Sequence, residues 1–164
     1  MPPNTPPDEN STILSILKGS RTIAVVGLSP KPERDSHHVA EYLQQQGYRI
    51  VPVNPVAADQ AILGERCWPS LSAAAEHHRI DVVDVFRNSA DVPPIAEEAI
   101  AIGANALWLQ LGVQHDGAAA HARAAGLQVV QQQCMLVEHQ RLLAQGALAG
   151  GQPGADAAGR QSAP

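Results

Sequence analysis

Short apolar segments alternate with amphipathic segments along most of this chain, and this alternation restricts the fold more than any other feature. The apolar segments have the length of strands and cover residues 22–27, 49–53, 81–86, 106–110 and 127–130. The segments between them repeat apolar residues at helical spacing, over residues 36–46, 70–78, 91–103, 116–126 and 134–144. Strands joined by helices pair in parallel through right-handed crossovers. The pattern therefore predicts an α/β protein with a doubly wound, five-stranded parallel sheet between two helical layers.

The two ends of the chain depart from this pattern. Residues 1–10 contain four prolines, and residues 146–164 are rich in glycine, alanine and proline. Such segments bury too little apolar surface to offset the entropy lost on ordering. We therefore expect a flexible lead over 1–10, one folded domain over 11–145 that begins with a helix at 11–18, and a disordered tail over 146–164.

Charge and composition restrict the class of partner. The formal net charge of −5 provides no general attraction to nucleic acids or anionic membranes. No apolar stretch reaches the ~20 residues of a membrane-spanning helix, and the first residues lack the pattern of a secretory signal. Cys67 and Cys134 form no zinc-binding pattern, and the histidine pairs at 37–38 and 77–78 point apart on a helix, which favours solvated faces over a metal site. We expect a cytoplasmic protein that binds no metal, and any anion site must be built from local groups.

The loop after the first predicted strand has the residues of a phosphate site. Ligands of doubly wound sheets bind at the carboxyl ends of the strands, where the winding reverses. In the segment VVGLSPKPERDS, Gly27 allows a tight turn and a close ligand approach, and Ser29 supplies a hydroxyl. Ser36 is placed to cap the next helix, whose N–H groups and dipole favour an anion. Lys31 and Arg34 are placed to donate to phosphate oxygens, and they are also compatible with ordinary solvated loop charges.

This loop does not match the usual nucleotide fingerprints. An NAD site uses a Gly-x-Gly-x-x-Gly loop and an acidic residue at the end of the second strand. Here the loop has the single Gly27, and the second strand ends in Asn54 and Pro55. A P-loop is also absent, because no Gly-Lys-Ser/Thr sequence occurs. The nucleotide that fits has several phosphates for the cations and a ribose that no acid reads, and coenzyme A (CoA) has these properties.

Six segments, in order, resemble one known family. They are VVGLSPKPERDS, PVNP, GERCWPSL, DVVDVFR, WLQLG and CMLVEH. Together they resemble the small bacterial CoA-binding proteins, which are stand-alone Rossmann-like domains similar to the CoA-binding domain of the succinyl-CoA synthetase α subunit. The resemblance covers about residues 12–143 and implies a Rossmann-like fold that holds CoA or an acyl-CoA at the carboxyl ends of the strands.

The resemblance implies a phosphate end to this site. Gly27, Ser29 and Arg34 would line the phosphates of the coenzyme. Ser36 would open the helix beneath them, and Arg87 would pair with phosphate from across the crevice.

The resemblance also implies contacts to the rest of the coenzyme. Asn54 and Pro55 would flank the adenosine end, and Phe86 would pack on the ligand. Gln110 and Gly112 would border the path of the pantetheine arm.

The resemblance does not imply ligase activity for this chain alone. In the synthetase a phosphorylated histidine belongs to a second domain, which this chain is too short to contain. We therefore expect a non-catalytic protein that binds CoA or an acyl-CoA, compatible with a protein partner or a homo-oligomer. The alternatives are an NAD(P)-dependent oxidoreductase, an acyl-CoA ligase subunit that needs a partner, and an interaction module with a vestigial crevice. Cys134, Glu138 and His139 belong to the resemblance without an assigned role.

Overall fold

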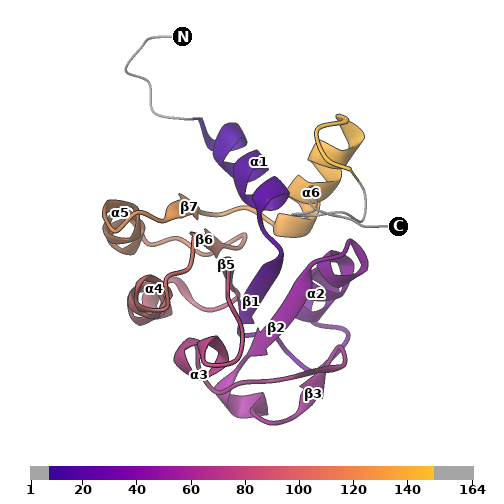
Figure 1. Cartoon of the computed structure of the whole chain (residues 1–164), viewed down its shortest axis with the longest axis vertical. Helices are drawn as coiled ribbons and strands as arrows, with labels where there is room; N and C mark the ends of the chain where they lie inside the picture. Colours follow the sequence, from indigo (N-terminus) through magenta and orange to yellow (C-terminus); the bar gives the residue numbers. More distant parts are fainter. Residues whose placement is uncertain (1–7, 150–164) are drawn as a thin grey trace.

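Five parallel strands form the centre of the protein, as the alternating pattern predicts (Figure 1). The computed structural model describes residues 8–149. The strand order in the main sheet is β2-β1-β5-β6-β7, and every neighbouring pair is parallel. The strands are β1 (Thr22–Val26), β2 (Arg49–Val53), β5 (Val82–Val85), β6 (Ala106–Leu109) and β7 (Gln128–Val130). The helices are α1 (Glu9–Gly19), α2 (Asp35–Gln45), α3 (Leu71–Ala75), α4 (Val92–Ala101), α5 (Asp116–Ala124) and α6 (Met135–Ala144).

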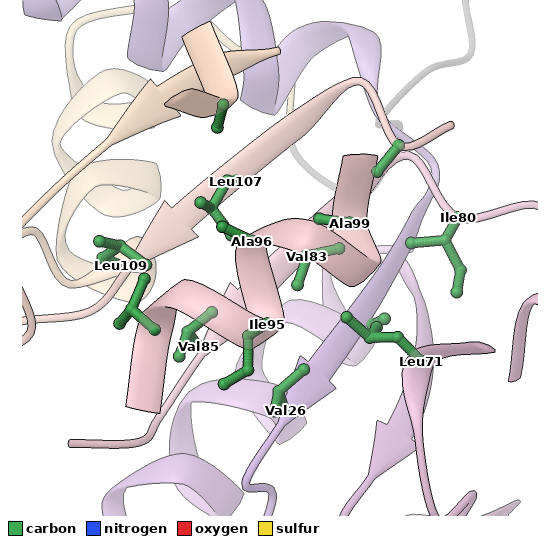
Figure 2. Close-up of a cluster of buried hydrophobic side chains, with 14 of the residues drawn as sticks. Val26, Leu71, Ile80, Val83, Val85, Ile95, Ala96, Ala99, Leu107 and Leu109 are labelled. Carbon is green, nitrogen blue, oxygen red and sulfur yellow. The ribbon is translucent and has the colours of Figure 1, made fainter. Parts of the chain in front are cut away.

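Two helical layers cover the two faces of the sheet. On one face, side chains of α1, α2 and α6 such as Leu43 and Met135 share a core with Trp108 of β6. On the other face α3, α4 and α5 form a second cluster, in which Val83 of β5 and Ile95 of α4 belong to the same core (Figure 2). The three-layer architecture predicted from the sequence is therefore confirmed. Within residues 8–149, every helix falls short of the length and apolar character needed to cross a membrane.

The winding of the sheet reverses between β1 and β5. The chain passes from β1 through α2 to β2 on one side of β1, and then through α3 to β5 on the other side. Crossovers that leave in opposite directions open a crevice at the carboxyl ends of the two strands. Gly27 follows β1 and Phe86 follows β5, so the two residues flank this crevice.

The first helix begins earlier than predicted. Asp8 caps α1 through its carboxylate, which accepts a hydrogen bond of 2.7 Å from the backbone N–H of Ser11. The helix therefore starts at Glu9, inside the segment predicted as a flexible lead. At the other end Leu148, placed in the predicted tail, packs against the core. The rest of the predicted lead and tail, residues 1–7 and 150–164, lies outside the described residues.

Residues 56–79 contain more structure than the predicted turn near Gly64 and helix at 70–78. They form a hairpin of β3 (Ala61–Ile62) and β4 (Glu65–Arg66). The two residues of its turn, Leu63 and Gly64, have φ of 54° and 78°, the combination of a type I′ turn that matches the twist of a hairpin. Strands of two residues carry no detectable alternation, so the sequence pattern misses them.

Pro52 fits into β2 because β2 is an edge strand. A proline lacks the N–H group that a central strand needs. The carbonyl of Pro52 accepts a hydrogen bond from the N–H of Trp68, at 2.9 Å. The backbone of Pro52 therefore points away from β1, and its missing N–H group lies on the outer edge of the sheet.

Removal of the cap of α3 is expected to destabilise the protein by about 1 kcal/mol, the usual value for a Ser-to-Ala change at an N-cap. Ser70 accepts a hydrogen bond of 3.1 Å from the N–H of Ala73. In Ser70→Ala this N–H loses its partner. Urea unfolding would measure the change, and Ser70→Asp, which keeps a capping oxygen, should stay near the wild-type stability. An equal loss in both variants would contradict the capping role.

Candidate functional site

A cavity of about 350 Å³ lies at the carboxyl end of β1. Its walls come from the loop after β1, the first turn of α2 and the end of β5, and the lining residues are Gly27, Ser29, Glu33, Arg34, Asp35, Ser36 and Phe86. Five of the ten residues expected from the resemblance lie in this lining. A larger cavity of about 690 Å³ lies beside α1 and β7 and contains none of the ten.

Gly27 is required where the chain leaves β1. Its φ is 88°, and a Cβ at this position would lie 2.4 Å from the carbonyl oxygen of Phe86. Its N–H donates to the carbonyl of Val53 at 2.8 Å, which fixes the backbone on the other side. The main chain of the loop therefore passes directly over the end of β5, a close approach that only glycine permits.

Two hydrogen bonds to serine hydroxyls close the loop between β1 and α2. The N–H of Ser29 donates to Oγ of Ser36 at 3.0 Å, and the N–H of Lys31 donates to Oγ of Ser29 at 3.1 Å. The prediction that Ser36 caps α2 is wrong: the helix begins one residue earlier, at Asp35, with Arg34 at the N-cap. The Ser36 hydroxyl is already used by the loop, so it binds the loop to the helix.

The charges of residues 31–35, between β1 and the start of α2, balance. Arg34 and Lys31 contribute two positive charges to the loop, and Glu33 and Asp35 contribute two negative charges. An anion would therefore gain little from the net charge of the loop. In the part of the chain that the structure describes, no side chain caps the N-terminus of α2. Directional donors, the first N–H groups of α2 and the guanidinium of Arg34, remain as the features that favour an anion.

The second wall of the crevice carries Phe86 and Arg87. The half-buried Phe86 lines the cavity and packs against the core beneath it. The aliphatic part of Arg87 lies beside Gly27, since its Cδ would be 3.0 Å from a Cβ there. The guanidinium of Arg87 pairs with Asp91 at 3.2 Å, and the Arg87 side chain is 39% exposed. Arg87 does not belong to the cavity lining, so it lies at the rim.

The side chain of Asn54 is bound to backbone groups on both sides. Its Nδ2 donates to the carbonyl of Leu28 at 3.0 Å, and its Oδ1 accepts from the N–H of Val56, also at 3.0 Å. Both polar groups of the side chain are thus occupied by backbone. Pro55 starts a 3-10 turn, Pro55–Ala57, and is exposed. Asn54 connects the end of β2 to the loop after β1.

Gln110 and Gly112 lie at the end of β6, outside the lining of this cavity. Gln110 is buried, donates to Asp84 and accepts from the N–H of Met135 at 3.3 Å. Its amide supports the start of α6. Gly112 is exposed, with φ of 86°, and its N–H donates to Gln132 at 3.0 Å.

The family model for the CoA-binding domain matches residues 21–140 of this chain. The chain belongs to the CoA-binding domain family. It is 40% identical over 127 residues to the uncharacterized protein YneT of Bacillus subtilis, with 77% of this chain and 91% of that protein covered. The structure of a hypothetical protein from Pyrococcus horikoshii superposes with a TM-score of 0.76 at 39% sequence identity. This match covers 87% of this chain and 99% of that chain.

A larger enzyme shares the fold of this CoA-binding domain. The dinucleotide-forming acetyl-coenzyme A synthetase 1 of Candidatus Korarchaeum cryptofilum superposes with a TM-score of 0.61. The match covers 71% of this chain and 26% of that chain, at 22% identity. The likeness shows a common Rossmann-like fold.

His37 is a residue of this CoA-binding domain that sequence reasoning placed wrongly. It was expected on a solvated face, and it is only 8% exposed, with Nδ1 at 2.9 Å from the carbonyl oxygen of Ser29. The sequence did contain a sign of this burial, because His37 stands three residues before Ala40 and so lies on the same buried face of α2.

Asp84 was treated as an ordinary strand residue, and it is a fully buried carboxyl group in the middle of the sheet. Gln110 donates to its Oδ1, and Oδ2 has no hydrogen-bond partner among the described residues. Burial raises the pKa of Asp84 from 3.8 to about 7, and the hydrogen bond from Gln110 opposes part of this rise.

The three residues without an assigned role face different neighbours. Cys134 stands at the N-cap of α6. Glu138 pairs with Arg141 at 2.7 Å, whereas the buried His139 contacts the hydroxyl of Tyr42 through Nδ1 at 2.8 Å. The Nδ1 of His139 and the carboxylate of Glu138 thus bind Tyr42 and Arg141, and the structure shows no base held against Cys134 by these two residues.

Proposed function

We propose that this protein binds CoA or an acyl-CoA as a non-catalytic binding protein, with the diphosphate of the coenzyme at the loop between β1 and α2. The observation that carries the proposal is the cavity at the winding reversal, with the start of α2 and Arg34 in its lining. A helix of 11 residues that presents its first N–H groups to a cavity is suited to an anion. Membership of the CoA-binding domain family supports CoA as the source of this anion.

The end of β2 supports CoA over NAD. An NAD site places an acidic residue there, which accepts hydrogen bonds from the adenosine ribose. Here the position is taken by Asn54, whose amide is already bound to the backbone of residues 28 and 56. The carboxylates of Glu33 and Asp35 belong to the loop and first turn of α2 and not to the end of β2.

The hydrogen bonds of the lining support a binding role. A hydroxyl nucleophile needs a base within hydrogen-bond reach. The hydroxyls of Ser29 and Ser36 both accept bonds from loop N–H groups, and His37 contacts the Ser29 carbonyl oxygen instead of the hydroxyl. The lining therefore orders the loop and presents no activated nucleophile. A ligase function would need residues from another subunit.

Calorimetric titration tests the ligand. The natively purified protein would be titrated with CoA, acetyl-CoA, dephospho-CoA and NAD. We expect CoA and acetyl-CoA to bind more tightly than NAD, because the loop provides donors for phosphates and β2 provides no acid for the ribose. Tighter binding of NAD would refute the proposal and favour the oxidoreductase alternative, whereas no binding of any nucleotide would favour the interaction module.

The substitution Arg34→Ala is expected to weaken CoA binding by about ten- to a hundredfold, the value of a hydrogen bond to a charged group. Arg34 lines the cavity and is exposed, so its loss should leave the fold intact. Arg79→Ala is the matched control. It removes the same charge from a side chain that is 82% exposed and lies before β5, at the opposite end of the strands. If both variants lose affinity equally, Arg34 acts through the overall charge of the protein and not as a contact.

A further inference from the structure

Two consecutive carbonyl groups in the loop after β1 are held by side chains from outside the loop. The carbonyl of Leu28 accepts from Nδ2 of Asn54 at 3.0 Å. The carbonyl of Ser29 lies 2.9 Å from Nδ1 of His37. A carbonyl oxygen carries partial negative charge, so one that turned into an anion site would repel the ligand. The loop can serve a phosphate only if both oxygens stay directed away from it.

The bond from His37 has a defined direction. A carbonyl oxygen can only accept, so Nδ1 must carry the proton. In the imidazolium form both ring nitrogens carry protons, and the same bond persists. His37 lies in the first turn of α2 and is 8% exposed, so its ring is largely shielded from water, and the bond to Ser29 is partly buried.

The bond from Asn54 also has a defined direction. Its Oδ1 accepts from the N–H of Val56 at 3.0 Å. The amide orientation is fixed by this bond, which leaves the NH₂ group for the carbonyl of Leu28. Leu28 itself is fully buried, so its peptide group is clamped between the core and Asn54.

We propose that His37 and Asn54 are positioning residues that hold the carbonyl oxygens of Ser29 and Leu28 away from the bound diphosphate. Neither residue belongs to the lining of the cavity; each acts through the backbone that it holds. The inference rests on the proposed function and changes the role expected for Asn54, from a contact of the adenosine to a clamp on the phosphate loop.

The test compares variants with and without the donor. His37→Leu removes the N–H group and keeps an apolar side chain of similar bulk. His37→Asn keeps an N–H at the position of Nδ1. The matched control is His38→Leu on the neighbouring, exposed position of α2. Asn54→Ser is a second, independent variant, because a serine can still cap the N–H of Val56 but is too short to reach Leu28.

CoA affinity by calorimetry and thermal unfolding would be measured for each variant. We expect His37→Leu and Asn54→Ser to weaken CoA binding by about tenfold or more, His37→Asn to stay within about threefold of the wild type, and His38→Leu to match it. A wild-type affinity in His37→Leu and Asn54→Ser, or an equal loss in His37→Leu and His37→Asn, would overturn the inference while the proposed function stands. A wild-type protein that does not bind CoA would overturn both.

Discussion

Replacement of Gly27 by alanine is expected to destabilise the protein by about 2–5 kcal/mol, the sum of the strain of a positive φ and an overpacked contact. The φ of 88° lies in the left-handed region, and the added Cβ would meet the carbonyl oxygen of Phe86 at 2.4 Å. Neither backbone can easily move. The N–H of Phe86 donates to Val26, and the N–H of Gly27 donates to Val53, each at 2.8 Å.

A matched glycine separates the two causes. Gly112 has a φ of 86°, and no atom lies within 4 Å of a Cβ at that position. Gly112→Ala should therefore cost only the backbone strain, about 1–2 kcal/mol. Guanidinium unfolding of both variants gives the difference that belongs to the contact with Phe86. Equal losses of stability would show that the loop does not pass as closely over β5 as the structure indicates.

Replacement of Asp84 by asparagine is expected to change how stability depends on pH. An aspartate in the unfolded chain has a pKa of 3.8, and burial raises the pKa of Asp84 to about 7 in the folded protein. Between these values the folded state holds a proton that the unfolded state has lost. The contribution of this carboxyl to stability is therefore complete below pH 3.8, decreases as the pH rises, and is lost above about pH 7.

The asparagine variant lacks this titration. Its stability relative to the wild type should rise by about 3–4 kcal/mol between pH 4 and pH 8, because each pKa unit corresponds to ~1.4 kcal/mol. The amide can still accept from Gln110 and resembles the protonated carboxyl in size. Urea unfolding of both proteins at several pH values measures the difference, in which the titration of other groups cancels. If this difference in stability stays constant with pH, the pKa of Asp84 in the folded protein is not raised and the prediction is wrong.

The two predictions concern adjacent parts of one structure. Gly27 sets the distance between the loop and β5, and Asp84 lies within β5 and connects through Gln110 to the start of α6. The crevice is thus built above a sheet whose centre contains a titratable group. If Gly27→Ala displaces the loop, it should also weaken the proposed CoA binding. A parallel measurement of folding would separate this effect from loss of the folded state.

Several residues that line the cavity at the end of β1 could be placed from the sequence. Gly27 was placed at the turn after the first strand because a glycine after an apolar run has a local signature, and the structure puts it at the winding reversal. Arg34 was placed in the loop that follows this strand, and the family resemblance implied Phe86; both residues line the cavity. These positions depend on where strands end, which the pattern of apolar residues shows directly.

The partners of the polar side chains could not be predicted in the same way. Ser36 was expected to cap α2, and its hydroxyl instead accepts from Ser29, seven residues earlier. His37 was assigned to a solvated face, although the stripe toward Ala40 was visible. Nothing in the sequence near Asp84 indicates that its partner is Gln110, because α4 and β6 lie between the two residues along the chain.

The sequence by itself determined the order of the helices and of the strands of the main sheet, and the edge of the sheet at which the crevice lies. Both follow from propensity and periodicity, which act between residues a few positions apart. The tertiary structure alone decided the strand order and the hydrogen bonds that shape the loop. The bond from Asn54 to Leu28 joins residues 26 positions apart. Such a bond exists only after β1 and β2 have paired, since pairing is what brings a polar group of one strand end within reach of the other.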